Sequence, residues 1–476
     1  MSGLANSANA PRVAIIGGGL AGMSAAVALV ANGVTVELFE ARRYLGGRTG
    51  SFFDAESGEW IDHCQHVALG CCTNFFDFCH RTEIATLLKR DSTLYFFGRD
   101  GRRHVMCGSN WLPAPLHLLP ALLRLRFLSL GQQLRIIRTM LRLTKTSPID
   151  SASSPTVGEW LRQQGESARS VEDFWAVILV SALGESVEKA SLPSARKVFV
   201  DGFMAANSAY EMHVPTVSLR ELYHERVGNW LRERGVIFHL ETPIASLRHE
   251  ASNIFLKSKQ ETEREFSAVV MAVPWRQIGE LCSPELLAEA PQLAAAAQIQ
   301  SSPISGVHLW FDRPIMDVPH AVLIGRLSQW VFAKTGRNVA NPSDAGCYYQ
   351  VVISASSDLA GRDRDDIIRE VCDDLTAVFP TVKKAKLVRA RTVSDPHAVF
   401  SVRPGLDEIR PLQSTTVPGL FLAGDWTRTG WPATMEGAVR SGYLAAEGVL
   451  KSLGTPQTII IPDLKKGRLA RMVCGA

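Results

Sequence analysis

Short runs of apolar residues recur along the chain, and they predict buried strands. The first run leads into a glycine-rich turn and an uncharged helical segment, and the last run also precedes a helix start. Two runs in the second half of the chain either alternate apolar with polar residues or are continuously apolar, a pattern that predicts strands of a separate sheet. The predicted strands are residues 13–16, 34–39, 236–240, 268–274, 306–311, 347–353 and 420–423.

Helical patterns occupy the segments between these runs. A long stretch of helical pattern covers 74–192, an amphipathic helix is expected around 217–234, and residues 367–379 form another helix. Because strands and helices alternate, the chain is predicted to have an α/β fold. The strand at 268–274 is expected to return the chain to the domain that contains strand 13–16.

The first strand ends in a glycine pattern that fits a dinucleotide. Gly17, Gly19 and Gly22 have the G-x-G-x-x-G spacing that permits a tight turn, close approach of a pyrophosphate and close helix packing. The helix start offers N–H groups to the phosphates. Strand 34–39 ends in Glu40, which can accept hydrogen bonds from a ribose diol and disfavours the 2′-phosphate of NADP. FAD or NAD is therefore expected, and a glycine turn in an unrelated α/β unit is the alternative.

Two further features favour FAD over NAD. A second Gly-Gly turn is followed by Arg48, which is expected to bind a cofactor phosphate or to pair with the loop of Glu40. Near the other end of the chain, Asp425 can accept a hydrogen bond from a ribityl hydroxyl, and the helix start near Thr434 can stabilise a reduced flavin ring. The candidate FAD-binding residues are Gly17, Gly19, Leu20, Ala21, Gly22, Glu40, Ala41, Arg42, Gly46, Gly47, Arg48, Ile244, Gly424, Asp425, Thr434 and Met435.

The composition fits a globular enzyme. The chain has 476 residues, of which 46% are hydrophobic and 21% charged, enough for a large core in about two or three domains. The net charge of +4 is too small to indicate a nucleic-acid partner. The nine cysteines lack metal-type C-x-x-C pairs, which indicates a reducing cytoplasm and no metal site. Residues 13–36 carry no charge, but the glycines inside this run argue against a membrane span or signal peptide.

The predicted domains interleave along the sequence. No second G-x-G-x-x-G is found in the sequence, so a separate NAD(P)H domain of the disulfide-reductase kind is not expected. The predicted architecture is a Rossmann-type FAD-binding domain interleaved with an α+β substrate domain. The FAD-binding domain is assigned to residues 11–70, 215–285 and 395–455, the substrate domain to 71–214 and 286–394, and a tail to 456–476.

The two glycine turns and the C-terminal Gly-Asp strand with its helix resemble the amine oxidase and phytoene desaturase superfamily of flavoproteins, which implies an amine oxidase-like fold. More narrowly, residues 60–71, 307–314 and 423–442 are similar to three blocks of the hydroxysqualene dehydroxylases, also called squalene-associated FAD-dependent desaturases. Cys64 departs from this pattern because glycine is expected there. Trp431 departs from it because a smaller apolar residue is usual.

The resemblance implies reductive removal of the hydroxyl of hydroxysqualene to give squalene, as in hopanoid or other triterpenoid synthesis. This chemistry needs a proton, so that the hydroxyl leaves as water, a hydride from reduced flavin, and a dry apolar tunnel. Asp62, Gln65 and His66 are expected at the flavin-facing end of the tunnel, with Asp62 or His66 as the acid. Alternatively, Asp62 caps a turn and His66 is a satisfied histidine. The electrons would come from NADPH or from a partner reductase.

Residues 116–145 combine large apolar side chains with basic ones, and no acid lies between Asp100 and Asp150. Basic amphipathic helices of this kind can lie on anionic lipid, in which a squalene-sized substrate dissolves. The predicted location is cytoplasmic, peripheral on the inner membrane face; a helix packed on the domain with a solvated basic face is the alternative. The basic residues are Arg124, Arg126, Arg135, Arg138, Arg142 and Lys145.

Two other functional classes remain open. One is an oxidative flavoenzyme, either a carotenoid-type desaturase or an amine oxidase. Amine oxidases typically carry a lysine just before the strand that corresponds to 307–311, where this chain has Ser305-Gly306. The other is a non-catalytic prenyl-lipid escort of the same fold, which would not need the predicted FAD-binding charges together.

Overall fold

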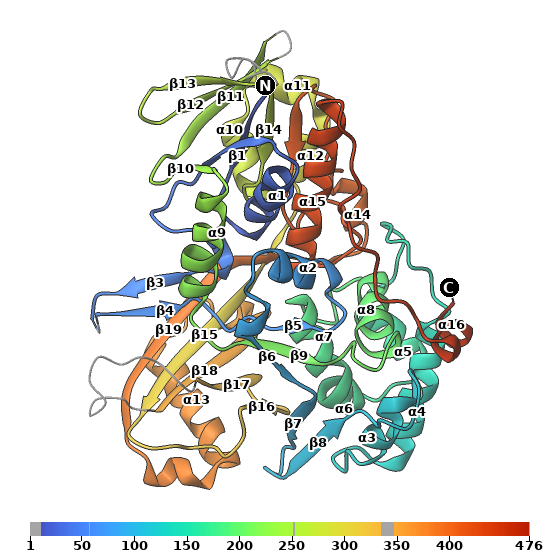
Figure 1. The fold of residues 1–476 in the computed structure, drawn as a ribbon. Coiled ribbons are helices and arrows are strands. Elements are labelled where there is room, and N and C mark those ends of the chain that lie inside the picture. Colours follow the sequence, from blue (N-terminus) through green and yellow to red (C-terminus); the bar gives the residue numbers. More distant parts are fainter. Residues whose placement is uncertain (1–10, 57, 251–252, 335–346, 476) are drawn as a thin grey trace.

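Apolar runs from both ends of the chain and from its middle form one parallel sheet (Figure 1). A computed structural model describes residues 11–475 except 57, 251–252 and 335–346. The central strand β1 pairs in parallel with both β2 and β14, so β14 returns the chain to the domain of β1, as predicted. In spatial order the strands are β10 (Ile237–His239), β2 (Thr35–Phe39), β1 (Arg12–Ile16), β14 (Ala268–Met271) and β20 (Leu420–Leu422).

Both faces of the parallel sheet are buried, which explains its uninterrupted apolar runs. Val13 and Ile15 belong to one core cluster together with residues of α1 (Leu20–Ala31) and α15 (Met435–Ser452), which pack side by side. Ala14 and Ile16 belong to a second cluster on the other face. That face is covered by an antiparallel sheet of β11 (Ile244–Glu250), β12 (Asn253–Ser258) and β13 (Glu263–Phe266).

A second large sheet has seven strands and lies below the parallel sheet in Figure 1. Its long strands β15 and β18 pair antiparallel, and they confirm the strands predicted at 306–311 and 347–353. Helix α13 (Arg364–Val378) packs on this sheet and confirms the helix predicted at 367–379. In spatial order the strands are β19 (Leu387–Phe400), β15 (Ser301–Phe311), β18 (Cys347–Ser354), β17 (Trp330–Lys334), β16 (His320–Leu323), β7 (Thr93–Phe97) and β8 (Arg103–Cys107).

The prediction of a helical stretch over 74–192 is wrong for residues 88–107, which form β6 (Leu88–Asp91), β7 and β8. Strand β7 consists of Thr, Leu, Tyr, Phe and Phe, residue types that favour strands. The helices that do lie in this region are α2 (Thr73–Arg81), η3 (Ala85–Leu87), η4 (Leu116–Leu118), α3 (Leu119–Leu123), α4 (Leu130–Leu143), α5 (Val157–Gln163), α6 (Ala168–Ser170), η5 (Val171–Trp175), α7 (Ala176–Leu183) and α8 (Leu192–Phe199).

The remaining elements connect the two large sheets. The helix predicted around 217–234 is confirmed as the consecutive segments η7 (Arg220–Val227) and α9 (Gly228–Glu233). Strands β3 (Ser51–Asp54) and β4 (Glu59–Asp62) form a hairpin, and β9 (Met212–Pro215) lies between β5 (Ala68–Leu69) and β6. The short helices are η2 (Gly47–Thr49), η6 (Val200–Met204), η8 (Trp275–Gln277), α10 (Ile278–Leu281), α11 (Pro284–Glu289), α12 (Pro291–Ala296), η9 (Ser357–Leu359), η10 (Pro380–Lys384) and α14 (Leu406–Ile409).

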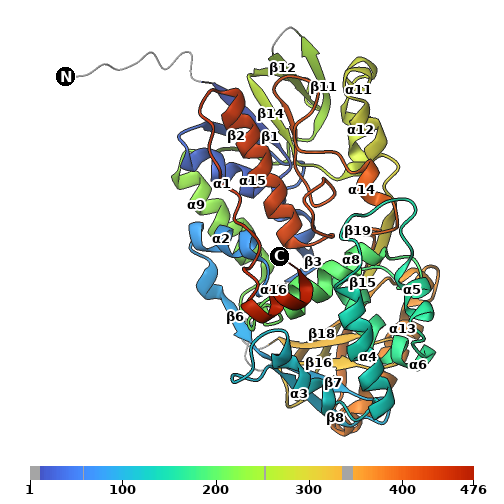
Figure 2. The same ribbon diagram turned by 90° about the vertical axis from the view of Figure 1, so that its right-hand side faces the viewer.

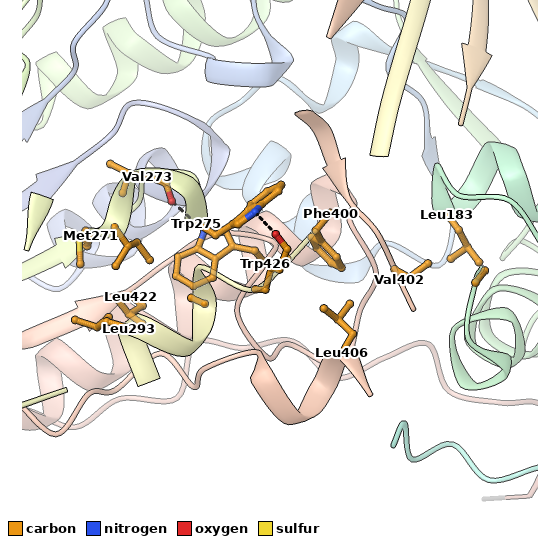
Figure 3. Close-up of a cluster of buried hydrophobic side chains, with 14 of the residues drawn as sticks. Leu183, Met271, Val273, Trp275, Leu293, Phe400, Val402, Leu406, Leu422 and Trp426 are labelled. Atoms are coloured by element: carbon orange, nitrogen blue, oxygen red, sulfur yellow. Dashed lines mark hydrogen bonds between the residues drawn. The ribbon is translucent and has the colours of Figure 1, made fainter. Parts of the chain in front are cut away.

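Large side chains at the ends of β14, β19 and β20 form the core that joins the sheets (Figure 3). Trp426 follows β20, is fully buried, and donates its indole N–H to the carbonyl of Val273 at 2.9 Å. Trp275 donates to the carbonyl of Ile299 at 2.8 Å. Phe400 at the end of β19 packs edge-on against Trp275, with 6.3 Å between ring centres. These contacts fix the three strand ends relative to one another.

Two features bear on the predicted domain boundaries. Strand β19 runs from Leu387 to Phe400 and so crosses the predicted boundary at residue 395. The segment 456–475, predicted as part of a tail, packs on the protein: the amides of Ile459 and Ile460 donate to the Glu447 carboxylate at 2.6 and 2.9 Å. It ends in helix α16 (Arg468–Cys474), which lies beside α8 in Figure 2. The segment predicted as a tail is therefore packed on the protein along its described part.

Candidate cofactor and substrate cavity

A cavity of about 930 Å³ extends from the parallel sheet to the seven-stranded sheet. Its lining includes Gly17 and Glu40 of the parallel-sheet part, and Phe332 and Val352 of the other sheet. All the predicted FAD-binding residues line it except Gly22. The fold therefore brings together residues that lie more than 400 positions apart in the sequence.

The turn between β1 and α1 forms a cradle for phosphate. Gly17 has a φ of +108°, and a Cβ there would lie 2.4 Å from the carbonyl oxygen of Ala272. A Cβ on Gly22 would lie 1.9 Å from the Gly17 oxygen, so this glycine serves helix packing. A Cβ on Gly19 would meet only the Cα of Gly47, at 4.0 Å, which leaves space for a ligand. Within the described residues no side chain caps the start of α1, so its N–H groups are available to phosphate.

Glu40 is buried at the end of β2, and backbone amides hold its carboxylate. Oε2 accepts a hydrogen bond from the N–H of Gly18 at 2.7 Å, and Oε1 accepts one from the N–H of Arg42 at 2.8 Å. Both bonds keep the carboxylate at the cavity wall. This is the placement that a ribose-binding carboxylate requires.

Arg48 connects the two predicted cofactor motifs. Its guanidinium donates to Asp425 Oδ1 at 2.5 Å and to the carbonyl of Ala398 at 3.0 Å, and it lies 6.0 Å from the ring centre of Trp275. Burial opposes the charge, but the Asp425 carboxylate raises the pKa of Arg48 above its ordinary value. The structure thus gives Arg48 a partner that the sequence did not predict, and it places both charges on the cavity wall.

The first turn of α15 also faces the cavity, where Thr434 and Met435 line it. The Thr434 hydroxyl accepts a hydrogen bond from the N–H of Gly437 at 3.1 Å and so caps the helix. Glu436, two residues after Thr434, is fully buried; it accepts hydrogen bonds from the N–H of Phe75 at 2.8 Å and from Arg440. The positive end of an 18-residue helix therefore points at the cavity, as predicted for a flavin site.

The structure does not place Asp62 on the cavity wall. Its side chain is buried, and Oδ1 accepts hydrogen bonds from the Ser51 hydroxyl at 2.7 Å and from the N–H of Leu219 at 3.0 Å. Lys334 Nζ lies 3.7 Å from Oδ2. Asp62 therefore holds β4 against η7, which agrees with the alternative of a structural carboxylate and not with an acid that contacts substrate.

Gln65 and His66 do line the cavity. His66 Nδ1 lies 3.1 Å from the carbonyl oxygen of Cys64, which can only accept, so Nδ1 carries the proton. Burial lowers the pKa of His66 to about 4, and the ring is uncharged at neutral pH. Gln65 donates to the carbonyl of His66 at 2.8 Å, while its buried Oε1 has no partner among the described residues. The pair therefore offers the cavity one acceptor, His66 Nε2, and no ready acid, since Gln65 Oε1 is buried.

A large part of the cavity lining is apolar, and the sequence did not predict most of its residues. They come from β7, β8, β9, β17, α7 and η6. The alternation of Leu94 and Phe96 was the available signal for β7, but it lay inside the segment predicted as helical. The apolar wall consists of Leu94, Phe96, Met106, Val177, Ile178, Phe203, Met212, Trp330 and Phe332.

Cys64 also lines the cavity, at the position where the family pattern has glycine. Burial raises the pKa of its thiol to about 12. The thiol is therefore protonated at neutral pH and is a poor nucleophile. This departure from the pattern adds bulk to the cavity wall and no reactive anion.

Neither a metal cluster nor a membrane-spanning helix is found in the part of the chain that the structure describes. No group of three or more His, Cys, Asp or Glu side chains there could share a metal ion. No described helix is long and apolar enough to cross a bilayer.

We predict that Asp425→Asn weakens FAD binding about 10- to 100-fold, because the substitution removes the partner of Arg48 and a charged acceptor from the cavity wall. Titration of apo-protein with FAD, followed by flavin fluorescence, measures the change. Asp395→Asn is the matched control, because Asp395 also lines the cavity but is not hydrogen-bonded to Arg48. Equal losses in both variants would contradict the role of the Arg48–Asp425 pair.

Comparison with known proteins agrees with this site. The family model of flavin-containing amine oxidoreductases matches residues 20–450. The 15-cis-phytoene desaturase of Synechococcus elongatus is 26% identical over 464 residues, which cover 92% of this chain and 96% of the relative. The zeta-carotene desaturase of Synechocystis sp. is 24% identical over 492 residues, with coverages of 94% and 99%.

Solved structures show the same fold. Cyclohexylamine oxidase from Brevibacterium oxydans superposes with a TM-score of 0.69 at 18% identity, covering 94% of this chain and 100% of that protein. Putrescine oxidase bound to putrescine gives a TM-score of 0.69 at 16% identity, with coverages of 93% and 99%. The predicted amine oxidase-like fold is confirmed. The chain belongs to the family of flavin-containing amine oxidoreductases, and its cofactor is FAD.

Proposed function

We propose that this flavoenzyme removes the hydroxyl of hydroxysqualene reductively and releases squalene. One observation carries the proposal: a single cavity is lined by the FAD-binding residues and by an apolar wall, and Gln65 and His66 line the same cavity. The three sequence blocks that resemble hydroxysqualene dehydroxylases support it, because two of them, 60–71 and 423–442, contribute to this cavity.

The residues of the chain bind and orient the substrate. The apolar wall receives the hydrocarbon and excludes water, which strengthens polar contacts inside the cavity. His66 Nε2 accepts a hydrogen bond from the hydroxyl and holds it, and Gln65 positions His66 by donating to its backbone carbonyl. Overall, the alcohol takes up one proton and one hydride and yields the hydrocarbon and water. Bound FAD, when reduced, supplies the hydride.

A carotenoid-type desaturase is the second candidate, because the relatives named above are a phytoene desaturase and a zeta-carotene desaturase. The same cavity suits a long isoprenoid hydrocarbon, and the neutral His66 ring could accept the proton that desaturation releases. An amine oxidase has weaker support, since its solved representatives are only 16–18% identical to this chain.

We predict that dithionite-reduced holoprotein, mixed anaerobically with hydroxysqualene, forms squalene in amounts equal to the flavin reoxidised. Chromatography of the product and the return of oxidised flavin absorbance measure the two quantities. In a parallel reaction, oxidised holoprotein is mixed with phytoene. If phytoene is converted to a more unsaturated polyene and the first mixture yields no squalene, the enzyme is a desaturase and the proposal is wrong.

We predict that the rate of this flavin reoxidation is constant from pH 8 to about 5 and falls as the pH approaches 4. The pKa of His66 is lowered to about 4, so the ring is neutral above that pH and loses its acceptor when it is protonated below it. His66→Gln keeps an acceptor and should remove this pH dependence at a cost of about tenfold in rate. A rate that instead rises about tenfold per pH unit between 7 and 4 would make His66 the acid.

His63 provides the matched control, because it also lines the cavity and burial also lowers its pKa. His63→Gln should retain the pH profile of the unsubstituted enzyme. If His63→Gln instead loses the fall in rate near pH 4, the group that titrates is not His66.

Association with an anionic membrane surface is the second part of the proposal, and the face of α4 supports it. Leu130, Leu134 and Leu141 are 72%, 64% and 45% exposed on one side of the helix. The opposite side, with Ile136 and Leu143, is buried. Among the described residues, the five arginines of 124–142 have no carboxylate partner within ion-pair distance. A merely solvated basic face would not require three exposed leucines.

We predict that replacing Leu130, Leu134 and Leu141 with Gln reduces co-sedimentation with anionic vesicles at least tenfold, because apolar side chains no longer insert below the headgroups. Leu412→Gln is the matched control, since Leu412 is 58% exposed in the loop after α14. The unsubstituted enzyme should bind less as salt rises. If the triple variant binds the vesicles as well as the unsubstituted enzyme at every salt concentration, this face of α4 is not the membrane contact.

A further inference from the structure

The segment 456–475 is here called the strap. From the outside, it connects the part of the fold built on the parallel sheet with the helical part around α4 and α8. Near its start, the amide of Ile461 donates to the side-chain oxygen of Asn74 in α2 at 2.8 Å. Further on, the amide of Gly467 donates to the carbonyl of Ala205 after η6 at 3.2 Å. At its end, the carbonyl of Val473 accepts a hydrogen bond from the hydroxyl of Thr144 after α4 at 3.0 Å. The strap therefore spans from α2, which packs against α15, to the end of α4 beside the proposed membrane face.

Asp463 in the middle of the strap is bonded to both parts. Its Oδ2 accepts a hydrogen bond from Lys197 of α8 at 2.7 Å. Its Oδ1 accepts hydrogen bonds from Arg440 of α15 and, at 3.3 Å, from the indole N–H of Trp431. A second carboxylate, Asp201, lies 2.7 Å from Lys197.

Two partners of Asp463 are themselves part of the cavity wall. Lys197 and Trp431 both line the cavity, one from each part of the fold. They touch each other, because the Lys197 ammonium lies 4.5 Å from the ring centre of Trp431. Trp431 is also one of the departures from the family pattern. Its indole N–H to Asp463 is a contact that a smaller apolar residue could not make.

The contacts of Asp463 with Lys197 and Trp431 are weak enough to break and re-form. Asp463 is 39% exposed and Lys197 20% exposed, so water and salt reach the ion pairs. Burial opposes the charge on Lys197, yet the two carboxylates raise its pKa, so the ammonium stays charged at neutral pH. No covalent bond joins the strap to the body, since all the described cysteines are free.

We propose that the strap closes this part of the cavity wall from the outside and that Asp463 is its latch: when Asp463 releases Lys197 and Trp431, the two wall residues can separate and a ligand can pass. The identity of the passing ligand as an isoprenoid depends on the proposed function. The closure itself does not, because release of FAD from the same cavity can report an opening of this wall without any isoprenoid.

Hydrogen exchange of the holoprotein tests the opening directly. In Asp463→Asn, the amides of 459–461 and 467 should exchange about tenfold faster than in the unsubstituted protein, with other segments unchanged. Trp431→Phe keeps the ring and removes one donor, so a two- to threefold increase is expected. The matched control is Asp373→Asn on the exposed side of α13, which should change nothing. Unchanged exchange in Asp463→Asn overturns the latch, as does an increase spread over the whole protein.

Ligand exchange tests whether the opening controls the cavity. FAD release from Asp463→Asn, followed by flavin fluorescence after dilution, should be several-fold faster, and rebinding should be faster by a similar factor. Labelled squalene supplied in neutral vesicles should likewise enter and leave faster, with its Kd changed less than threefold. Faster hydrogen exchange without faster FAD release overturns the closure. Failure of squalene to bind either protein contradicts the proposed function only, and FAD release then decides on the strap.

Discussion

The ion pair between Arg48 and Asp425 is the contact on which the site depends. It joins the second glycine turn to the end of β20, and a further hydrogen bond from Arg48 reaches β19 at Ala398. One guanidinium thus fixes three segments from distant parts of the sequence at the cavity wall. A partly buried ion pair of this kind contributes little net stability, because desolvation offsets the attraction. Its value lies in geometry, since it sets the distance between the dinucleotide cradle and the start of α15.

Around this contact the cavity divides into regions of different chemistry. Backbone amides, Glu40 and the starts of two helices serve a charged dinucleotide, whereas the far wall is almost entirely apolar. His66 also lines the cavity and is held neutral by burial, although its hydrogen bond to the Cys64 carbonyl favours the charged ring. An uncharged boundary lets a hydrocarbon approach the cofactor without desolvating an ion, which would cost several kcal/mol.

The parallel sheet and its cofactor residues could be predicted from the sequence because local geometry determines them. Only glycine fits at Gly17 and Gly22, and strands buried on both faces leave uninterrupted apolar runs. The apolar wall could not be predicted in this way, since β7 pairs with β16 more than 200 residues later. Asp62 could not be placed from the sequence for the same reason. Its hydrogen bonds to Ser51 and to the N–H of Leu219 hold it off the cavity wall, and the spacing of residues along the chain does not reveal these contacts.

The strand order of the parallel sheet also constrains how the protein is made. Strand β1 leaves the ribosome first, but its sheet is completed only by β20 at residues 420–422. At about 5–20 residues per second, roughly 20–80 s of translation separate the two. During that interval Arg48 has no partner and the edge of β14 is open. A stalled or truncated nascent chain therefore lacks half of its flavin cradle and exposes apolar strands to chaperones and proteases.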